Sequence, residues 1–484
     1  MKSAKPIGAV LHESPIEDRY DSYINYANRI REIFGLNYAL SMFCCAALRN
    51  YRRAFHNGED KPIAAQAYVF DQFKRKEELD LLRQVYGRLF IVISVYSERT
   101  TRQQNMVSRI ASDHADARLA DDHKAIASKL MQRDQTEEGL PHGQGLEDAF
   151  PTADLFIDLD DQPSAEKLLR RFLDAFFGSN AMSPTHDEYG MYLARTTALR
   201  SVDLSRQVGA AVFTPTHEVI SVGCNEVPKP LGGTYWTDDD GDARDLKKGF
   251  DSNERIKRSL LVDFTKRLKE NGYLKAEIKE TEVARFIVTE TSRGGKLRNA
   301  QLMDLLEFGR MIHAEMSAIC DAARGGHSIR GSTLYCTTFP CHMCAKHIIA
   351  AGIKRVVYIE PFPKSYAEQL HSDAIIIGRV KSEDRVVFEP FIGISPYRYR
   401  DLFGRDRKRK DDDGKFKPWI EAGPEPIVKL TVATYLSNEA AVIGLFNEII
   451  KKKIADGLIE IVTAPPSVAN NPSTDAKPGV QGRH

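Results

Sequence analysis

The segment with the clearest capacity for chemistry covers residues 311–344. It contains a histidine two residues before a glutamate, His313 and Glu315, and a later cysteine pair, Cys341 and Cys344. One imidazole and two thiolates suit Zn²⁺, and three protein ligands leave the fourth position to water, as in a catalytic site. Glu315 cannot easily reach the same ion, but it can sit beside the bound water and move protons. The spacing therefore predicts a catalytic zinc centre.

Both parts of this ligand set are expected at the start of a helix. Pro340 suits a first helical turn, so Cys341 and Cys344 fall on adjacent turns near the positive end of the helix dipole, where thiolates are favoured. His313 opens an apolar-periodic segment that predicts a second helix, and residues 332–339 between the two resemble a strand. Two helix N-termini would then meet over one ion.

The other histidines and cysteines nearby leave an alternative open. The cysteine pair, His347 and one further ligand would make a structural zinc site, and His342 also lies close in sequence. Cys336 lies inside the strand pattern and Cys320 on an apolar helix face. Both are expected to be buried as small hydrophobic residues.

Length and composition set broad limits. At 484 residues the chain favours two domains with insertions. Its 68 basic and 67 acidic residues give no overall positive charge for nucleic-acid binding, although a nucleotide needs only a local basic pocket. Seven irregularly spaced cysteines and an N-terminus without an apolar core predict a reducing cytoplasm. The apolar runs are too short to span a bilayer, so no membrane association is expected.

The sequence around the metal ligands resembles a known family. His-x-Glu followed by Pro-Cys-x-x-Cys is the signature of zinc deaminases. Residues 200–203, 207–210 and 224–228 resemble the dCMP deaminase form of the cytidine deaminase fold. A helix over 187–197 and strands over 208–213 and 219–223 fit that layout, and the resemblance covers about 186–236 and 305–377. The fold expected for residues 181–463 is therefore a cytidine deaminase-like α/β/α sandwich.

The resemblance also implies substrate contacts. In the family, the asparagine that matches Asn225 reaches the sugar hydroxyl and the base. Phe339, directly before the Pro-Cys pair, and Ala314 are further candidates for substrate binding. An amide can donate and accept, as a nucleoside edge requires, and an aromatic ring can stack on a pyrimidine. Alternatively, Asn225 is a turn residue before Pro228, and Phe339 is a core aromatic.

Three cations are candidates for binding phosphate groups: Arg200, Lys229 and Lys364. The last lies in a segment, residues 360–366, that resembles the substrate-side loop of the same family. Each of them, taken singly, also fits a solvated surface charge.

Residues 1–180 are expected to form an α/β domain. Helices are predicted over 36–53, 77–86 and 164–177, and strands over 65–70, 89–96 and 153–158, with residues 89–96 read as a buried strand of a parallel sheet. This order resembles the nucleotide-kinase-like P-loop domain of bacterial antiphage dCTP/dCMP deaminases. The chain has no Gly-x-x-x-x-Gly-Lys-Ser/Thr, so ordinary ATP binding is not expected, and a scaffold role stays open.

Two further segments depart from the family pattern. Residues 236–300 read as a charged, solvated insertion with a helix over 255–275, for which an active-site or oligomer role stays open. Residues 386–420 match no chemistry that can be derived from the sequence. Residues 464–484, rich in Pro, Ser, Asn and Gly, are expected to be disordered.

The resemblance implies hydrolytic deamination of deoxycytidine nucleotides, dCTP or dCMP or both, with depletion of dCTP as a defence against phage. It also implies a homo-oligomer and leaves room for an inhibitory partner or RNA. One alternative is a deaminase acting on cytidine or adenosine in RNA or DNA, which would need an extended basic or aromatic surface. Another is a regulatory or assembly protein with a vestigial deaminase site.

Overall fold

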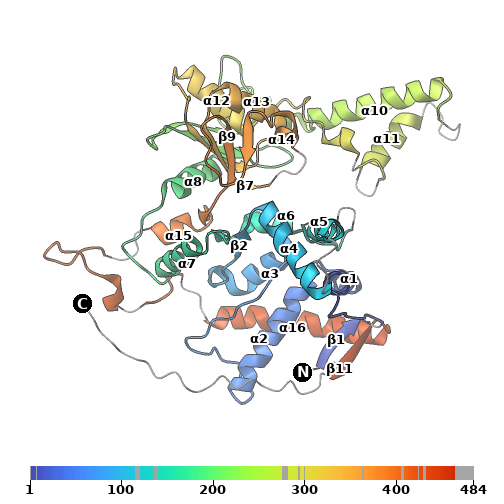
Figure 1. Ribbon diagram of the computed structural model, residues 1–484, viewed down its shortest axis with the longest axis vertical. Helices are drawn as coiled ribbons and strands as arrows, with labels where there is room; N and C mark the ends of the chain where they lie inside the picture. The colour runs from blue at the N-terminus through green and yellow to red at the C-terminus, as the bar shows by residue number, and fades with distance from the viewer. Residues whose placement is uncertain are drawn as a thin grey trace. The chain divides into compact units, whose positions relative to one another are not determined.

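The computed structural model of the chain describes most of its residues (Figure 1). The described ranges are 2–6, 8–114, 120–135, 137, 140–274, 282–292, 295–298, 300–361, 365–404, 408–422, 424–428 and 432–463. The chain divides into two compact units, one of residues 1–90, 103–146 and 430–484 and the other of residues 91–102 and 147–429. The tail predicted to be disordered, 464–484, lies outside the described residues, and the predicted domain boundary at 180/181 stays a prediction.

The second unit contains a six-stranded sheet with the order β5-β4-β6-β7-β9-β8. Strand β4 runs antiparallel to both β5 and β6, whereas β6, β7, β9 and β8 are parallel. The strands are β4 (Gly209–Phe213), β5 (Val219–Cys224), β6 (Thr333–Thr338), β7 (Arg355–Glu360), β8 (Ile375–Ile377) and β9 (Val386–Pro390). The predicted hairpin of β4 and β5 is confirmed.

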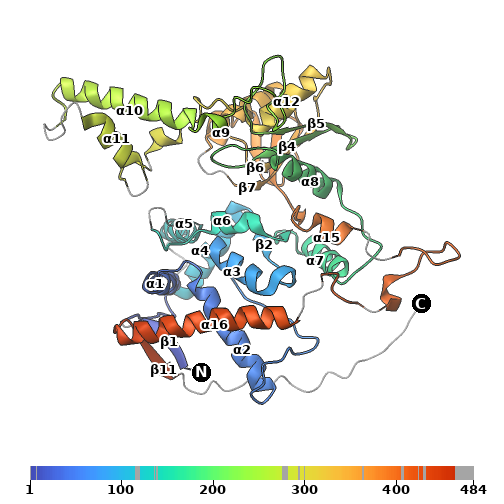
Figure 2. The same cartoon turned by 180° about the vertical axis from the view of Figure 1, so that it is seen from behind.

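Helices cover both faces of this sheet (Figure 2). Because alternate strand residues point to opposite faces, Ala211 and Phe213 of β4 pack with α8 (His186–Ala198), whereas Ala210 and Val212 pack with the helices that carry the metal-binding motif. Those helices are α12 (Ala314–Arg324) and α13 (His342–Ala350), and the short α14 (Ala367–Leu370) lies beside α13. A capping box of Thr185 and Glu188 starts α8. This arrangement confirms the predicted α/β/α layering of the domain.

Glycine allows α12 to lie close to strand β5. A Cβ on Gly223 would be 2.4 Å from both the carbonyl oxygen of Ala314 and the amide nitrogen of Ala318. Both atoms belong to the helix backbone, so no rotamer change can relieve the clash. The position of α12, and of His313 directly before it, therefore depends on a residue without a side chain at position 223.

Replacing Gly223 with Ala is expected to destabilise the second unit by about 1–3 kcal/mol, the usual cost of overpacking. The change pushes α12 away from the sheet, so zinc binding should weaken as well. Denaturant unfolding and zinc titration would measure both effects. The control is Gly444→Ala in α16 (Val432–Ala455), where a Cβ meets no atom within 4 Å. Equal behaviour of the two variants would contradict the prediction.

A second, three-stranded sheet has the order β10-β3-β2. Strands β2 (Ile93–Tyr96) and β3 (Leu155–Asp158) pair in parallel, as predicted, and β10 (Gly393–Ile394) is antiparallel to β3. Helix α7 (Gln162–Phe176) packs on β3 and ends, as expected, just before Gly178.

Two predictions for this region are wrong. The strand predicted over 89–96 is shorter, because residues 87–89 form a 3₁₀ turn, and β2 is an edge strand with Ile93 40% and Val95 48% exposed. Residues 65–70 pair with no other strand and have no regular structure. An apolar run alone cannot distinguish a paired strand from an extended loop.

The first compact unit is mainly helical. Helices α2 and α3 confirm the predictions over 36–53 and 77–86, and a core of Ile30, Met42 and Phe446 joins α1, α2 and α16. Its elements include α1 (Ile16–Phe34), α2 (Ala39–Phe55), α3 (Lys76–Tyr86), α5 (Ala120–Gln135) and the antiparallel pair β1 (Lys2–Pro6) and β11 (Ile459–Thr463). Helix α4 (Arg99–His114) has residues in both units, and α6 (Leu146–Ala149) begins at their boundary. The resemblance to a nucleotide kinase stays a prediction.

The described part of the insertion between β5 and α12 includes the α-helices α9 (Asp245–Lys248), α10 (Ser252–Glu270) and α11 (Val283–Thr291) (Figures 1 and 2). Helix α10 confirms the predicted helical segment, and Leu261 packs against Val283 and Ile287 of α11. Helix α15 (Tyr399–Phe403) contacts α7. Among the described residues, no helix combines the length and apolarity needed to cross a bilayer.

Candidate metal centre

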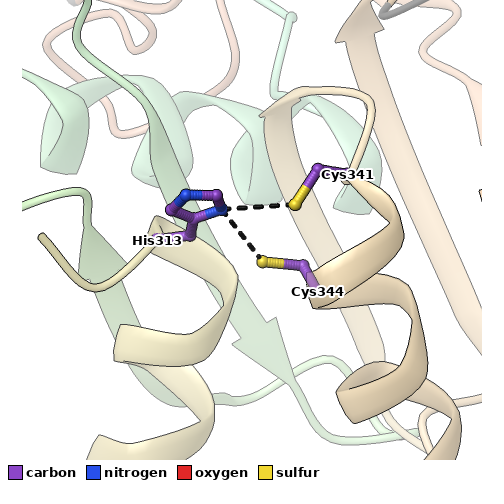
Figure 3. Close-up of side chains that lie close together, drawn as sticks. All are labelled: His313, Cys341 and Cys344. Atoms are coloured by element: carbon purple, nitrogen blue, oxygen red, sulfur yellow. Dashed lines mark hydrogen bonds between the residues drawn. The ribbon is translucent and has the colours of Figure 1, made fainter. Parts of the chain in front are cut away.

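The two helices that cover one face of the large sheet begin at the predicted ligands. His313 is the N-cap of α12 and Cys341 is the N-cap of α13, both with extended backbone angles, and Cys344 lies in the first turn of α13. All three side chains point toward one another in Figure 3. The predicted meeting of two helix N-termini is therefore confirmed, and their dipoles favour negative charge on the sulfur atoms.

The distances between the donor atoms fit a zinc ion. His313 Nδ1 lies 3.3 Å from Cys341 Sγ and 3.4 Å from Cys344 Sγ. Zn–S bonds of about 2.3 Å and Zn–N bonds of about 2.0–2.1 Å at tetrahedral angles give an N···S separation of about 3.6 Å. All three donor atoms lie within 4.8 Å of one another, and no other group of at least three such donors occurs in the described ranges. Soft sulfur and imidazole donors in this number suit zinc.

The same geometry shifts the pKa values of the ligands. The hydrogen bond to the Cys341 sulfur raises the pKa of His313 to about 9, despite the opposing effect of burial. The hydrogen bond from Cys344 lowers the pKa of Cys341, and that of Cys344 rises because of the same bond and its burial. These shifts favour a thiolate on Cys341 and a protonated imidazole on His313.

Zinc binding at neutral pH is expected to release the protons held by His313 and by one thiol. Metal ligands must be deprotonated, and the pKa of His313 is raised, so protons compete with the metal below about pH 9 and apparent zinc affinity should rise with pH up to that value. Calorimetric titration of metal-free protein in buffers of different protonation enthalpy would count the released protons. An affinity independent of pH between about 6 and 9 would contradict the expectation.

Glu315 lies in the first turn of α12 and is 4% exposed. Burial raises the pKa of its carboxyl, and the negative charge of Cys341 raises it further. His313 and Cys344 also act on this group, so the carboxyl lies within electrostatic range of all three candidate ligands. A buried carboxyl with a raised pKa beside a metal position is suited to holding and returning a proton.

The alternative zinc ligands lie apart from this group. His347 is exposed on α13 and is not among the clustered donors. Cys336 is fully buried in the core, as predicted. The same prediction is wrong for Cys320, which is exposed on α12 because its face of the helix turns away from the sheet.

The residues predicted to contact the nucleoside lie close to the metal centre in the fold. Ala314 is the first residue of α12 and is fully buried. Phe339 packs edge-on against Tyr358, with ring centroids 4.9 Å apart, as the core-aromatic alternative expects. Asn225 is buried just after β5. Their roles toward a substrate stay predictions.

The amide of Asn225 already has backbone partners. Its Nδ2 donates to the carbonyl oxygen of Arg206 at 2.8 Å, and its Oδ1 accepts from the backbone N–H of Val208 at 2.7 Å. These two bonds fix the loop that leads into β4. The side chain of Asn225 therefore stabilises the loop of residues 206–208.

The three predicted phosphate contacts have different surroundings. The guanidinium of Arg200 stacks over the ring of Trp236 at 3.8 Å, and Lys229 Nζ forms an ion pair with Asp239 at 2.8 Å. Lys364 lies outside the described residues.

The sequence analysis did not single out Arg206, which the fold places beside the metal centre. Its charge opposes protonation of His313, and its Nη1 lies 3.8 Å from Glu360 Oε2. A single arginine in a loop carries no signal of its own, so the only cue in the sequence is that Arg206 directly precedes Gln207 and Val208.

Comparison with known proteins agrees with this geometry. Residues 184–360 match the family described as the cytidine and deoxycytidylate deaminase zinc-binding region. Over 54 residues the chain is 54% identical to the deoxycytidylate deaminase of Enterobacteria phage T2, a match that covers 11% of this chain and 29% of the phage protein. It is 39% identical over 80 residues to ComE operon protein 2 of Bacillus subtilis (strain 168), covering 16% and 42% respectively.

A similar solved structure is the dCMP deaminase of cyanophage S-TIM5 in complex with dCMP and dUMP. It is 19% identical, with a TM-score of 0.25, and the alignment covers 44% of this chain and 100% of that chain. The chain spans under a third of the length of the phage T2 relative and under half of the Bacillus subtilis one. Residues 184–360 are thus similar to the cytidine and deoxycytidylate deaminase zinc-binding region, and the cluster of His313, Cys341 and Cys344 within them fits a zinc site.

Proposed function

We propose that this chain catalyses the hydrolytic deamination of deoxycytidine nucleotides, dCMP or dCTP or both, to uracil nucleotides. One observation carries the proposal. The ligand atoms of His313, Cys341 and Cys344 lie within 4.8 Å of one another. Glu315 is buried in the first turn of α12, the helix that His313 caps. Relatives named deoxycytidylate deaminase match the chain over short segments and support the choice of substrate.

His313, Cys341 and Cys344 would hold the zinc ion. When bound there, zinc lowers the pKa of a coordinated water from about 15.7 toward about 7. The remaining work falls to Glu315, whose pKa is raised by burial, so that its carboxyl can take up a proton and pass it on at neutral pH.

The proton transfers assigned to Glu315 account for both protons of the attacking water. Its carboxylate takes one proton from the attacking water and delivers it to the ring nitrogen next to the amino-bearing carbon, while the water oxygen adds to that carbon. The same carboxylate then moves the second proton from the added oxygen to the amino group. The C–N bond breaks, ammonia leaves, and a carbonyl forms.

The proposal extends to the wider role of the protein. The resemblance to antiphage dCTP/dCMP deaminases favours depletion of dCTP as the biological outcome, in the cytoplasm and in a homo-oligomer, with an inhibitory partner or RNA as the control. Residues 1–180 would then be a nucleotide-kinase-like domain without a Walker A motif among the residues of this sequence. Arg200, Lys229 and Lys364 are the proposed phosphate contacts, and Asn225, Ala314 and Phe339 the proposed nucleoside contacts.

The test is an incubation of the purified full chain with dCTP, dCMP, CTP and CMP, followed by chromatographic separation of the products. Conversion of a deoxycytidine nucleotide to its uracil counterpart, with release of ammonia, is the expected result. Parallel reactions with tRNA and single-stranded DNA test the polynucleotide alternative. Deamination of those substrates alone, or no deamination by zinc-loaded protein, would overturn the proposal.

A further inference from the structure

The insertion between β5 and α12 is attached to the residues directly before His313. Two of its helices, α9 and α10, follow one another where the insertion joins the sheet domain (Figure 2). Residues 243–257 of the insertion contact residues 303–310, which lead from the insertion to His313, at two places. No pattern in the sequence indicated either contact.

The first attachment is an ion pair at the start of α9. Arg310 Nη1 donates to Asp245 Oδ1 at 2.7 Å and to the carbonyl oxygen of Ala243 at 2.9 Å. The Asp245 side chain is 8% exposed and the Arg310 side chain 31%, so the carboxylate is shielded from water and the guanidinium is partly buried. Arg310 is three residues before the metal-binding histidine.

A buried carboxylate continues this attachment. Glu226 exchanges backbone hydrogen bonds with Ile312, at 3.0 and 3.3 Å, so the two residues form an antiparallel bridge beside His313. The carboxylate of Glu226 accepts from the N–H of Val202 at 3.1 Å and lies 3.8 Å from Arg244. Arg244 itself belongs to the insertion, where Asp242 binds its guanidinium at 2.8 and 2.9 Å.

The second attachment lies at the beginning of α10. Asn253 donates to the carbonyl oxygen of Leu305 at 2.8 Å and accepts from the N–H of Phe308 at 3.2 Å, and Lys257 Nζ donates to the carbonyl oxygen of Met303 at 2.6 Å. Asn253 and Lys257 are both buried. These bonds satisfy backbone groups that have no strand partner, so they fix the path of the segment.

We propose that the insertion positions the metal ligand His313, with Asp245 and Arg310 as the principal positioning residues. His313 is the N-cap of α12: its carbonyl oxygen accepts from the N–H of Ser317 at 2.8 Å, but its N–H side continues into the preceding segment, so that segment also holds its backbone. Outside the insertion, that segment is held by the bridge of Ile312 to Glu226, by Asn225 Nδ2 at 3.8 Å from Met311 Sδ, and by Leu306 in the core of the sheet. The insertion adds the side-chain bonds to Arg310 and to the backbone of residues 303–308. The inference rests on the proposed function in taking His313 as a zinc ligand.

The experiment measures zinc affinity of the full chain by competition with a chromophoric chelator. Asp245→Asn keeps the shape of the side chain but removes its charge, and it is expected to lower zinc affinity about 10-fold, at the lower end of effects seen for groups that orient metal ligands. Asp245→Glu, which can re-form the ion pair, should recover most of the loss. Amide exchange at Ile312 should become faster in Asp245→Asn only.

The matched control is Asp263→Asn, which breaks the exposed pair between Asp263 and Arg267, at 2.9 Å, on α10 of the same insertion. It is expected to leave zinc affinity unchanged. If Asp245→Asn fails to fold by circular dichroism, Arg310→Lys, which keeps the charge but loses the contact to Ala243, decides the question in its place and should weaken zinc binding likewise.

The outcomes separate the inference from the proposed function. If the wild-type chain binds zinc but Asp245→Asn and Arg310→Lys bind it as tightly as Asp263→Asn, the positioning role is overturned and the proposed function stands. If the wild-type chain binds no zinc, or His313→Ala binds it equally well, both are overturned. Weaker zinc binding in Asp245→Asn with recovery in Asp245→Glu supports the inference.

Discussion

Replacing Glu315 with Gln is expected to reduce turnover of the deoxycytidine nucleotide by about 10²–10⁴-fold, the contribution usual for general acid–base catalysis. Glutamine has the same shape, but it cannot take a proton from water. Because Glu315 is not one of the three clustered donors, the variant should still bind one zinc per chain. Product formation measured by chromatography and zinc content measured by atomic absorption would show the two effects separately.

The variant should also fold well, because removing a buried charge removes its desolvation cost. Burial raises the pKa of Glu315, so a neutral amide at this position is expected to leave the protein at least as stable as the wild type. Glu383→Gln serves as the control, since Glu383 is 92% exposed and paired with Lys354. Full activity in Glu315→Gln would exclude the proposed proton transfers, and loss of zinc would reassign Glu315 to the ligand set.

Replacing Cys344 with Ala is expected to abolish both zinc binding and deamination. Two donors from His313 and Cys341 cannot fill three positions of a tetrahedral site, and structural or catalytic zinc sites use at least three protein ligands. Zinc content should fall below one equivalent per chain after dialysis, and activity should not return on adding zinc. The metal-free wild type, by contrast, should regain activity when zinc is restored.

Cys320→Ala is the matched control for this change. It removes a thiol from the same zinc-binding domain, but Cys320 is exposed on α12 and lies outside the donor cluster. Zinc content and activity should both stay at wild-type values. A Cys344→Ala variant that keeps its zinc would show that another residue completes the site and would revive the structural ligand set that includes His347.

The sequence predicted the parts of this protein that depend on local patterns. The hairpin of β4 and β5, the two helices that begin at His313 and Cys341, and the convergence of the ligands all follow from periodicity and from a motif with fixed spacing. Helix ends were predictable where a glycine or proline marked them, as at Gly87 after α3. These features need no knowledge of distant residues.

Features that depend on tertiary contacts could not be predicted. The apolar run over 89–96 contributes only four residues to a strand because its partner β3 is four residues long, and residues 65–70 found no partner at all. Cys320 is exposed because one side of α12 faces away from the sheet, which the sequence pattern did not resolve. The pair of Asp245 and Arg310 joins residues 65 positions apart across an insertion, and charges at such separations give no sequence signal.

The short separation of the ligands along the chain has a consequence for folding kinetics. His313 and Cys344 are only 31 positions apart, so closing the metal-bound loop costs little chain entropy. Strand β4, in contrast, pairs with β6 across a separation of more than a hundred residues, with the whole insertion in between. We therefore expect α12, β6 and α13 to order locally before the hairpin of β4 and β5 pairs with β6.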